Sequence, residues 1–249
     1  MRILVLGMGK TGKLVAEVAA ERGHSVNVLD AKENAGASAL TPPFVAGFDV
    51  VIDFTTPEAT IQNMRACLAT GAKMVVGTTG WYDRLPDMRG LAERKRAALL
   101  YGTNFSIGVQ VMLQLAKKMA EMLKNAGYEF SIEETHHTSK LDAPSGTAMS
   151  LATAVVEQMK KESSVEGLGT RQNEYHVQVE SKRVGDVAGI HTLVAKSEAD
   201  RLLLTHEAFS RRGFAEGAVR AAEWLSSRTG CYDFQDVYTA IGQRGEEPR

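Results

Sequence analysis

The sequence predicts an α/β fold: a doubly wound, Rossmann-type parallel sheet, together with a second α+β domain that has a mixed or antiparallel sheet. Two observations indicate this. Over the first hundred residues, short apolar runs alternate with segments of helical spacing, and continuous apolar runs are typical of parallel strands covered on both faces. After residue 105, several strand-like runs follow one another with little helix between them.

The first domain is expected to alternate strands and helices. Apolar runs predict strands at residues 3–6, 26–29, 50–54, 74–76 and 98–101. Helices are expected between them at residues 11–22, 56–71 and 87–96. The first of these helices stops at Gly23, a residue that favours a helix end. The second begins with Thr56 and Pro57, a hydroxyl cap followed by proline.

The second domain begins with a long helix at residues 107–125, whose methionine-rich apolar stripe is expected to fill a core. Strands are expected at residues 128–134, 176–182, 189–195 and 202–207, and a further helix at 148–161. A last helix, 215–226, has one apolar side and is expected to pack on the first domain, and the polar stretch 243–249 is expected to fray. We therefore expect one domain from residues 1–105 and 213–249, and another from residues 106–212.

The composition excludes several classes of partner. The chain has 249 residues, and its 29 Lys and Arg are balanced by 30 Asp and Glu, which supplies no positive field for nucleic acid or an anionic membrane. Cys67 and Cys231 lie far apart and match no metal-ligand spacing. The apolar run at residues 3–6 is too short for a signal peptide, and no run approaches a membrane span. We expect a cytoplasmic protein.

A glycine-rich turn between the first strand and the first helix predicts a dinucleotide site. Its residues, in the pattern G-x-G-x-x-G, are Gly7, Met8, Gly9, Lys10, Thr11 and Gly12. The glycines permit a tight turn, close approach of a pyrophosphate and close packing of helix on strand, and the helix start offers its amides to the phosphates.

The end of the next strand bears on the choice of cofactor. Asp30 would bind ribose hydroxyls, which favours NAD, whereas Lys32 would bind a 2′-phosphate, which favours NADP. An alternative is that Asp30 only caps its own loop. NADH, NADPH or both are therefore the expected cofactors.

Two further loops follow predicted strands at the edge where doubly wound sheets bind ligands. The first contains Gly77, Thr78 and Thr79, and the second contains Gly102, Thr103, Asn104 and Phe105. Small and hydroxylated residues there can approach a nicotinamide ring and hydrogen-bond its carboxamide. Each segment alone is also compatible with a simple turn.

Residues 133–147 crowd titratable and hydroxyl side chains into a strand-to-helix connection. They include His136, His137, Lys140, Ser145, Gly146 and Thr147. Histidine can donate a proton near neutral pH, lysine supplies a charge and a second proton, and the helix start at 145–147 would hold a carboxylate. Adjacent histidines on a strand point to opposite faces, so we expect no metal here. Histidines without any function are the alternative.

This block resembles that of the 4-hydroxy-tetrahydrodipicolinate reductase family, also called dihydrodipicolinate reductases, of the diaminopimelate route to lysine. The matching residues are Glu134, His136, His137, Lys140, Asp142 and the run 143–148. Further matches follow in the family's order at residues 53–55, 77–80, 104–109, 183–186 and 214–225. The resemblance therefore spans nearly the whole chain.

The resemblance implies an NAD(P)H-dependent oxidoreductase that reduces a cyclic imine dicarboxylate, 4-hydroxy-tetrahydrodipicolinate, to tetrahydrodipicolinate with loss of water. It implies that His136 is the general acid and that Lys140 donates a proton and holds substrate. The residues implied to bind substrate are His137, Ser145, Gly146 and Thr147. Those implied to bind cofactor are residues 7–12, Asp30, Lys32, Phe54, residues 77–79 and residues 102–105. Also implied are a dinucleotide-binding first domain, a substrate-binding second domain and a homotetramer built through the latter.

Two other functions stay open. Another two-domain nicotinamide dehydrogenase, acting on an amino acid such as aspartate or homoserine, would share the first hundred residues. It has no reason to carry His136 and His137 together with Lys140. A nicotinamide-sensing protein would need only the cofactor loops, and the proton donors argue against it.

Overall fold

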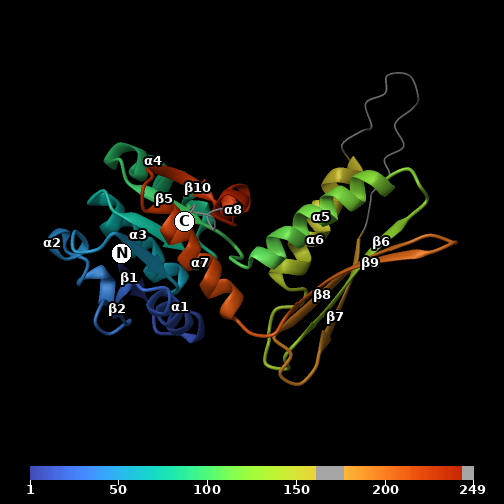
Figure 1. Cartoon of the computed structure of the whole chain (residues 1–249), viewed down its shortest axis with the longest axis horizontal. Coiled ribbons are helices and arrows are strands. Elements are labelled where there is room, and N and C mark those ends of the chain that lie inside the picture. The colour runs from blue at the N-terminus through green and yellow to red at the C-terminus, as the bar shows by residue number, and fades with distance from the viewer. Residues whose placement is uncertain (161–176, 243–249) are drawn as a thin grey trace, which may run out of the picture. The chain divides into compact units, whose positions relative to one another are not determined.

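The computed structural model describes residues 1–160 and 177–242. The chain divides into two compact units, the first made of Met1–Ile107 with Arg211–Arg249 and the second of Gly108–Ser210. Each unit has its own sheet (Figure 1). The expected fraying at 243–249, the first residue of the expected strand 176–182 and the last residue of the expected helix 148–161 lie outside the described residues.

The sheet of the first unit has six parallel strands in the order β10-β5-β4-β3-β1-β2. They are β1 Arg2–Leu6, β2 Ser25–Leu29, β3 Val50–Asp53, β4 Lys73–Val76, β5 Ala98–Tyr101 and β10 Gly230–Asp233. The chain leaves β1 toward β2 on one side and returns to β3 on the other. The carboxyl ends of β1 and β3 therefore flank the switch point at which such sheets bind ligands.

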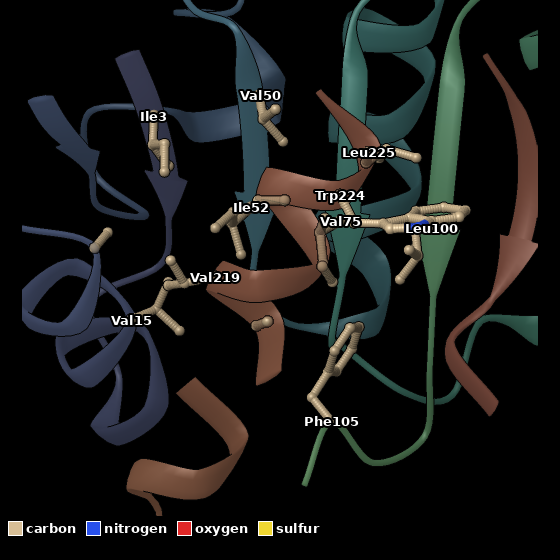
Figure 2. Close-up of a cluster of buried hydrophobic side chains, with 14 of the residues drawn as sticks. Ile3, Val15, Val50, Ile52, Val75, Leu100, Phe105, Val219, Trp224 and Leu225 are labelled. Atoms are coloured by element: carbon tan, nitrogen blue, oxygen red, sulfur yellow. The ribbon is translucent and has the colours of Figure 1, made fainter. Parts of the chain in front are cut away.

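Helices cover both faces of this sheet. On one face, α1 (Lys10–Glu21), α7 (Arg212–Leu225) and α8 (Phe234–Gly242) pack against side chains such as Ile52 and Leu100 (Figure 2). On the other, α2 (Pro42–Val45), α3 (Pro57–Ala69) and α4 (Leu85–Lys95) pack against side chains such as Val51 and Leu99. Two short 3₁₀ turns lie at Ala35–Ala37 and Tyr82–Arg84. Cover on both faces explains why β1, β3, β4 and β5 are buried along most of their length.

The second unit has a four-stranded sheet in the order β7-β6-β8-β9. Its strands are β6 Glu129–His136, β7 Gln178–Arg183, β8 Gly189–Lys196 and β9 Arg201–Ala208. β6 runs parallel to β7 and antiparallel to β8, and β8 runs antiparallel to β9, so the sheet is mixed. Helices α5 (Ile107–Leu123) and α6 (Gly146–Lys160) share a core with one face of it.

The stripe on α5 is part of that core, since Met112, Leu113 and Ala116 are buried with Ile132 and Leu193 of the sheet. β6 alternates between exposed or half-buried and buried residues, so its helix-covered face continues from Ile132 through Glu134 to His136. Two polar residues thus extend an apolar row.

The predicted fold class is confirmed, but several elements differ from expectation. β10 and α8 were not predicted, and they complete the first sheet and one of its faces. β6 runs on to His136, so this histidine belongs to the strand and not to the connection after it. Helix α7 begins at Arg212, three residues earlier than expected.

Candidate active site

The G-x-G-x-x-G segment forms the turn from β1 into α1. Gly7 has a φ of 98°, and a Cβ there would lie 2.5 Å from the carbonyl oxygen of Phe54. A Cβ on Gly12 would lie 2.0 Å from the carbonyl oxygen of Gly7, so the close packing of α1 on the turn requires glycine. A Cβ on Gly9 would meet no atom within 4 Å.

The start of α1 fits an anionic group. Gly9 precedes the helix without any side-chain cap, and the first turn carries no acidic residue. The first amides of a helix have no partner within it and carry partial positive charge. Open space at Gly9 beside these amides fits the pyrophosphate of a dinucleotide. Met8 and Lys10 of the same turn are exposed, and Thr11 is half-buried.

Asp30 closes the turn that follows β2. Its Oδ1 accepts hydrogen bonds from the backbone N–H groups of Glu33 (2.9 Å) and Lys32 (2.7 Å), which lower the pKa of Asp30. Its own N–H donates to Oε2 of Glu33 at 3.0 Å. Asp30 therefore caps its loop through Oδ1. The Lys32 residue is exposed.

Phe54, directly after β3, lies against the loop that follows β4. A Cβ on Gly77 would lie 2.2 Å from the Phe54 ring, and the rings of Phe54 and Phe105 stand edge to face with centroids 6.2 Å apart. The loops after β3, β4 and β5 therefore meet at the Phe54 ring, and the turn after β1 lies against the Phe54 backbone. Their remaining members are Thr79 and Thr103, which are exposed, Asn104, which is half-buried, and Gly102, which is buried.

A buried carboxylate fixes two of these loops. Asp53, the last residue of β3, is fully buried, and its Oδ1 accepts from Thr55 N–H (2.9 Å) and the Thr78 hydroxyl (3.0 Å). Its Oδ2 accepts from the side-chain amide of Asn63 at 2.8 Å. We gave Asp53 no role from the sequence. Its place at the carboxyl end of a buried strand was the signal that could have identified it.

In the second unit, the two adjacent histidines have different surroundings. His136 is buried, and its ring lies edge to face with that of His191, with centroids 4.9 Å apart. His137 is half-buried, and its Nδ1 lies 2.9 Å from the Ser139 hydroxyl.

Lys140 and the start of α6 lie in the connection after β6. The Nζ of Lys140 donates to both carboxylate oxygens of Asp142, at 2.7 and 2.8 Å, and this contact lowers the pKa of Asp142. Ser145 caps α6, since its Oγ accepts from the N–H of Ala148 at 3.2 Å. Gly146 is exposed and Thr147 is half-buried at the helix start.

Glu134 stands at the centre of these elements. It is buried, and its carboxylate accepts hydrogen bonds from Ser145 N–H (3.1 and 3.2 Å) and from the Ser181 hydroxyl (2.7 Å). Nδ1 of His136 lies 3.5 Å and Nε2 of His191 lies 3.7 Å from Oε2 of Glu134. Burial raises the pKa of Glu134, but the hydrogen bonds from the serines outweigh it, so the net shift is downward and the carboxylate is ionised.

Glu134, His136 and His191 offer ligand atoms that lie within 4.8 Å of one another, an arrangement that could hold a metal ion. The carboxylate of Glu134 and Nε2 of His191 already contact Ser145 N–H and Oγ, and the Arg183 guanidinium lies 3.6 Å from Glu134. The positive charge of Arg183 at that distance would repel a metal cation bound to Glu134. We therefore describe the group as a hydrogen-bonded cluster.

None of the described helices is both long and apolar enough to cross a lipid bilayer.

Two family models match the chain. One describes the N-terminus of dihydrodipicolinate reductase and covers residues 1–105, and the other describes its C-terminus and covers residues 108–238. The chain belongs to the dihydrodipicolinate reductase family.

Curated relatives agree with this assignment to the dihydrodipicolinate reductase family. A 4-hydroxy-tetrahydrodipicolinate reductase of Christiangramia forsetii is 37% identical over 97% of this chain and 99% of its own length. One from Natronomonas pharaonis is 37% identical over 95% of this chain and 100% of its own length. One from Chromobacterium violaceum is 41% identical over 80% of this chain and 77% of its own length.

Solved structures agree on the fold. A dipicolinate-bound dihydrodipicolinate reductase from Paenisporosarcina sp. TG-14 matches with a TM-score of 0.74 and 24% identity, over 95% of this chain and 99% of that one. A probable dehydrogenase from Thermotoga maritima matches with a TM-score of 0.58 and 10% identity, over 97% and 93%. The two-domain architecture is thus shared with more distant dehydrogenases, and the family assignment comes from the sequence relatives.

Membership of the dihydrodipicolinate reductase family confirms the predicted activity. The protein is an NAD(P)H-dependent oxidoreductase of the diaminopimelate route to lysine, as predicted, in preference to the alternatives of a sensor and an amino-acid dehydrogenase. The described glycine turn fits a dinucleotide, in agreement with this cofactor class.

His191 is expected to make the protein acid-sensitive. Burial lowers the pKa of His191 from 6.5 to about 4. Between these values the unfolded chain binds a proton that the folded protein does not, so the free energy of unfolding falls as the pH is lowered from about 6.5 to 4, by up to about 3 kcal/mol. Urea unfolding at several pH values measures this loss.

A matched variant isolates the contribution of His191. Burial also lowers the pKa of His136 and His206, so these two add a loss of the same sign. His191→Gln removes only one titrating group, and its stability should depend less on pH over this window, whatever its absolute value. An equal pH dependence in the variant and the parent protein would contradict the assignment.

Proposed function

We propose that this reductase converts 4-hydroxy-tetrahydrodipicolinate to tetrahydrodipicolinate with loss of water, and that His136 is the acid that protonates the ring carbon next to the site of reduction. The observation that carries this is the setting of His136. It is a buried imidazole at the end of β6, with a carboxylate 3.5 Å from its Nδ1 and the start of α6 beside that carboxylate. Such a carboxylate stabilises the protonated ring.

The connection after β6 supplies the groups that would hold a dianionic substrate. The start of α6 at Gly146 and Thr147 favours a carboxylate, next to Ser145, whose own N–H donates to Glu134. His137 and Lys140 would contact the remaining carboxylate and the ring. Lys140 now donates to Asp142, so substrate binding would exchange one carboxylate partner for another, and Lys140 could then also donate a proton.

The first unit would bind the cofactor. When bound, the reduced nicotinamide supplies the hydride. Residues 7–12 would hold the pyrophosphate, and the loops that carry Phe54, residues 77–79 and residues 102–105 would surround the nicotinamide. Asp30 would still bind ribose through Oδ2, because the described hydrogen bonds of its side chain use Oδ1.

We also propose a cytoplasmic homotetramer built through the second sheet. Both cysteines are free thiols, which is typical of a reducing compartment. The face opposite α5 and α6 carries apolar side chains, among them Leu203, which is 54% exposed, and Val194, its partner in the β8–β9 ladder. Light scattering of the purified protein tests the stoichiometry.

A coupled assay tests the function and the cofactor together. The substrate is made in place from pyruvate and aspartate semialdehyde by the preceding synthase, and oxidation of NADH and of NADPH is followed in separate reactions. We expect synthase-dependent oxidation of both, because Asp30 lies beside Lys32. A preference above about a thousandfold, roughly 4 kcal/mol, would show that one of these residues does not reach the ribose. No oxidation of either would contradict the proposed substrate.

A further inference from the structure

We infer that Glu134 is a positioning residue of this site. Its buried carboxylate holds the His136 ring, the start of α6 and, through Arg183, the loop of Lys140 in one arrangement. The inference rests on the proposed function of His136. Three sets of contacts support it, one for each element that Glu134 joins.

The first set fixes the start of α6. The N–H of Ser145 donates to both oxygens of Glu134, at 3.1 and 3.2 Å. The Oγ of the same serine accepts from Ala148 N–H, which begins the helix, and lies 3.1 Å from Nε2 of His191. The place of the helix amides that would bind a substrate carboxylate is therefore set by one buried side chain on β6.

The second set links Glu134 to the loop of Lys140. The Arg183 guanidinium lies 3.6 Å from Oε1 of Glu134, and Arg183 stands opposite His136 in the β6–β7 ladder. The same guanidinium donates to the carbonyl oxygens of Asp142 (2.6 Å) and Lys140 (3.3 Å). A single arginine thus connects the buried carboxylate with the backbone of the loop that carries the second proton donor.

The third set orients His136. Glu134 and His136 are two residues apart on β6 and share its helix-covered face, which brings Oε2 to 3.5 Å from Nδ1. A carboxylate there favours the proton on Nδ1 and stabilises the charged ring. A Cβ on residue 189 would lie 3.0 Å from Nε2 of His136, so glycine at that position leaves this nitrogen free of a close contact from β8.

The charges around His136 come from several elements. Glu134 on β6 and Asp142 in the connection raise its pKa, while Lys140 in the connection and Arg183 on β7 lower it. On β8 the neighbouring ring is His191, which stays neutral near pH 7. Burial lowers the pKa of His136 overall, so Glu134 keeps the acid usable at higher pH than burial alone would allow.

Glu134→Gln tests the inference, because it removes the charge and keeps the size. For the parent enzyme, kcat/KM should fall as the pH rises through the pKa of His136, since the acid must be protonated. In the variant we expect kcat/KM to fall by roughly 10–100-fold, as it does when other residues that orient a histidine are replaced. The part of the pH profile in which kcat/KM falls, called the limb below, should move to lower pH. The pKa of His136 itself, followed by proton NMR of its ring, should fall in parallel.

Two further variants separate the charge from the architecture. Arg183→Gln removes a cation that lowers the pKa of His136, so the limb should move to higher pH, opposite to Glu134→Gln. Ser181→Ala removes a hydrogen bond to Glu134 but leaves its charge, so the limb should stay in place. If these substitutions only loosened the site, the pH dependence of kcat/KM would not shift in opposite directions in Glu134→Gln and Arg183→Gln.

The pKa of His136 in these variants determines whether the inference is correct. A folded Glu134→Gln protein with an unmoved His136 pKa, or shifts of the same sign in Glu134→Gln and Arg183→Gln, would overturn the inference. If Glu134→Gln does not fold, the test of the inference is whether the pKa of His136 rises in Arg183→Gln. If His136→Asn retains the parent limb, the proposed function of His136 is wrong, whereas the NMR titration still measures the effect of Glu134 on the ring.

Discussion

Replacing His136 and Lys140 together by alanine is expected to lower kcat by at least roughly 10³-fold, because one positioned acid alone contributes about 10²–10⁴-fold. The affinity for NADH should change little. Both residues belong to the second unit, whereas the glycine turn and the loops around Phe54 belong to the first. Turnover in the coupled assay and quenching of NADH fluorescence measure the two properties separately.

The single variants serve as controls for this result. His136 is buried beside Glu134, so its loss leaves a carboxylate without that neighbour, and thermal unfolding must show that the protein still folds. Lys140 is partly exposed, and Lys140→Arg keeps the charge while changing the donor geometry. Unchanged turnover in the double variant would refute the assignment of proton chemistry to this pair.

Gly9→Ala and Gly12→Ala are expected to fail in different ways. A Cβ at residue 9 meets no atom of the protein within 4 Å, and Gly9 has an ordinary φ of −69°, so stability should be unchanged. The new methyl group would enter the space that the pyrophosphate is proposed to occupy. We expect the Kd for NADH to rise by about 10–100-fold, or roughly 1.4–2.8 kcal/mol.

Gly12→Ala provides the contrast. Its Cβ would lie 2.0 Å from the Gly7 carbonyl oxygen, a backbone atom, so α1 or the turn must shift. Overpacking of this kind costs about 1–3 kcal/mol, and we expect the Tm to fall together with NADH affinity. Calorimetry and fluorescence titration distinguish the two variants. An equally strong binder with Ala at residue 9 would show that the pyrophosphate does not approach this turn.

The sequence was most informative where the structure repeats a simple pattern. The strands β1 to β5 were predicted within one residue at either end, because each contains a short apolar run. β10 was missed since Gly230–Asp233 has four residues and only two apolar side chains. It is a strand because β5 offers a free edge to pair with, which no local pattern records.

For the candidate site too, local sequence patterns were informative and contacts made by strand pairing were not predicted. His136, Lys140 and Ser145 are neighbours in sequence and were found together. Ser181 and His191 were not, because only the register of the sheet, which pairs both with Glu134, brings them to the site. Glu134 could have been found, since a residue two positions before His136 on a strand must share its face.

The first unit is assembled from two distant stretches of chain, since β10 near its end pairs with β5, whereas the second unit is one continuous stretch. During synthesis the ribosome therefore releases β1 to β5 long before α7 and α8, which cover one face of that sheet. Ile52 and Leu100 stay uncovered on that face while the inserted unit completes its own core. We therefore expect the inserted unit to complete its fold first, and the nascent chain that lacks α7 and α8 to expose the most apolar surface.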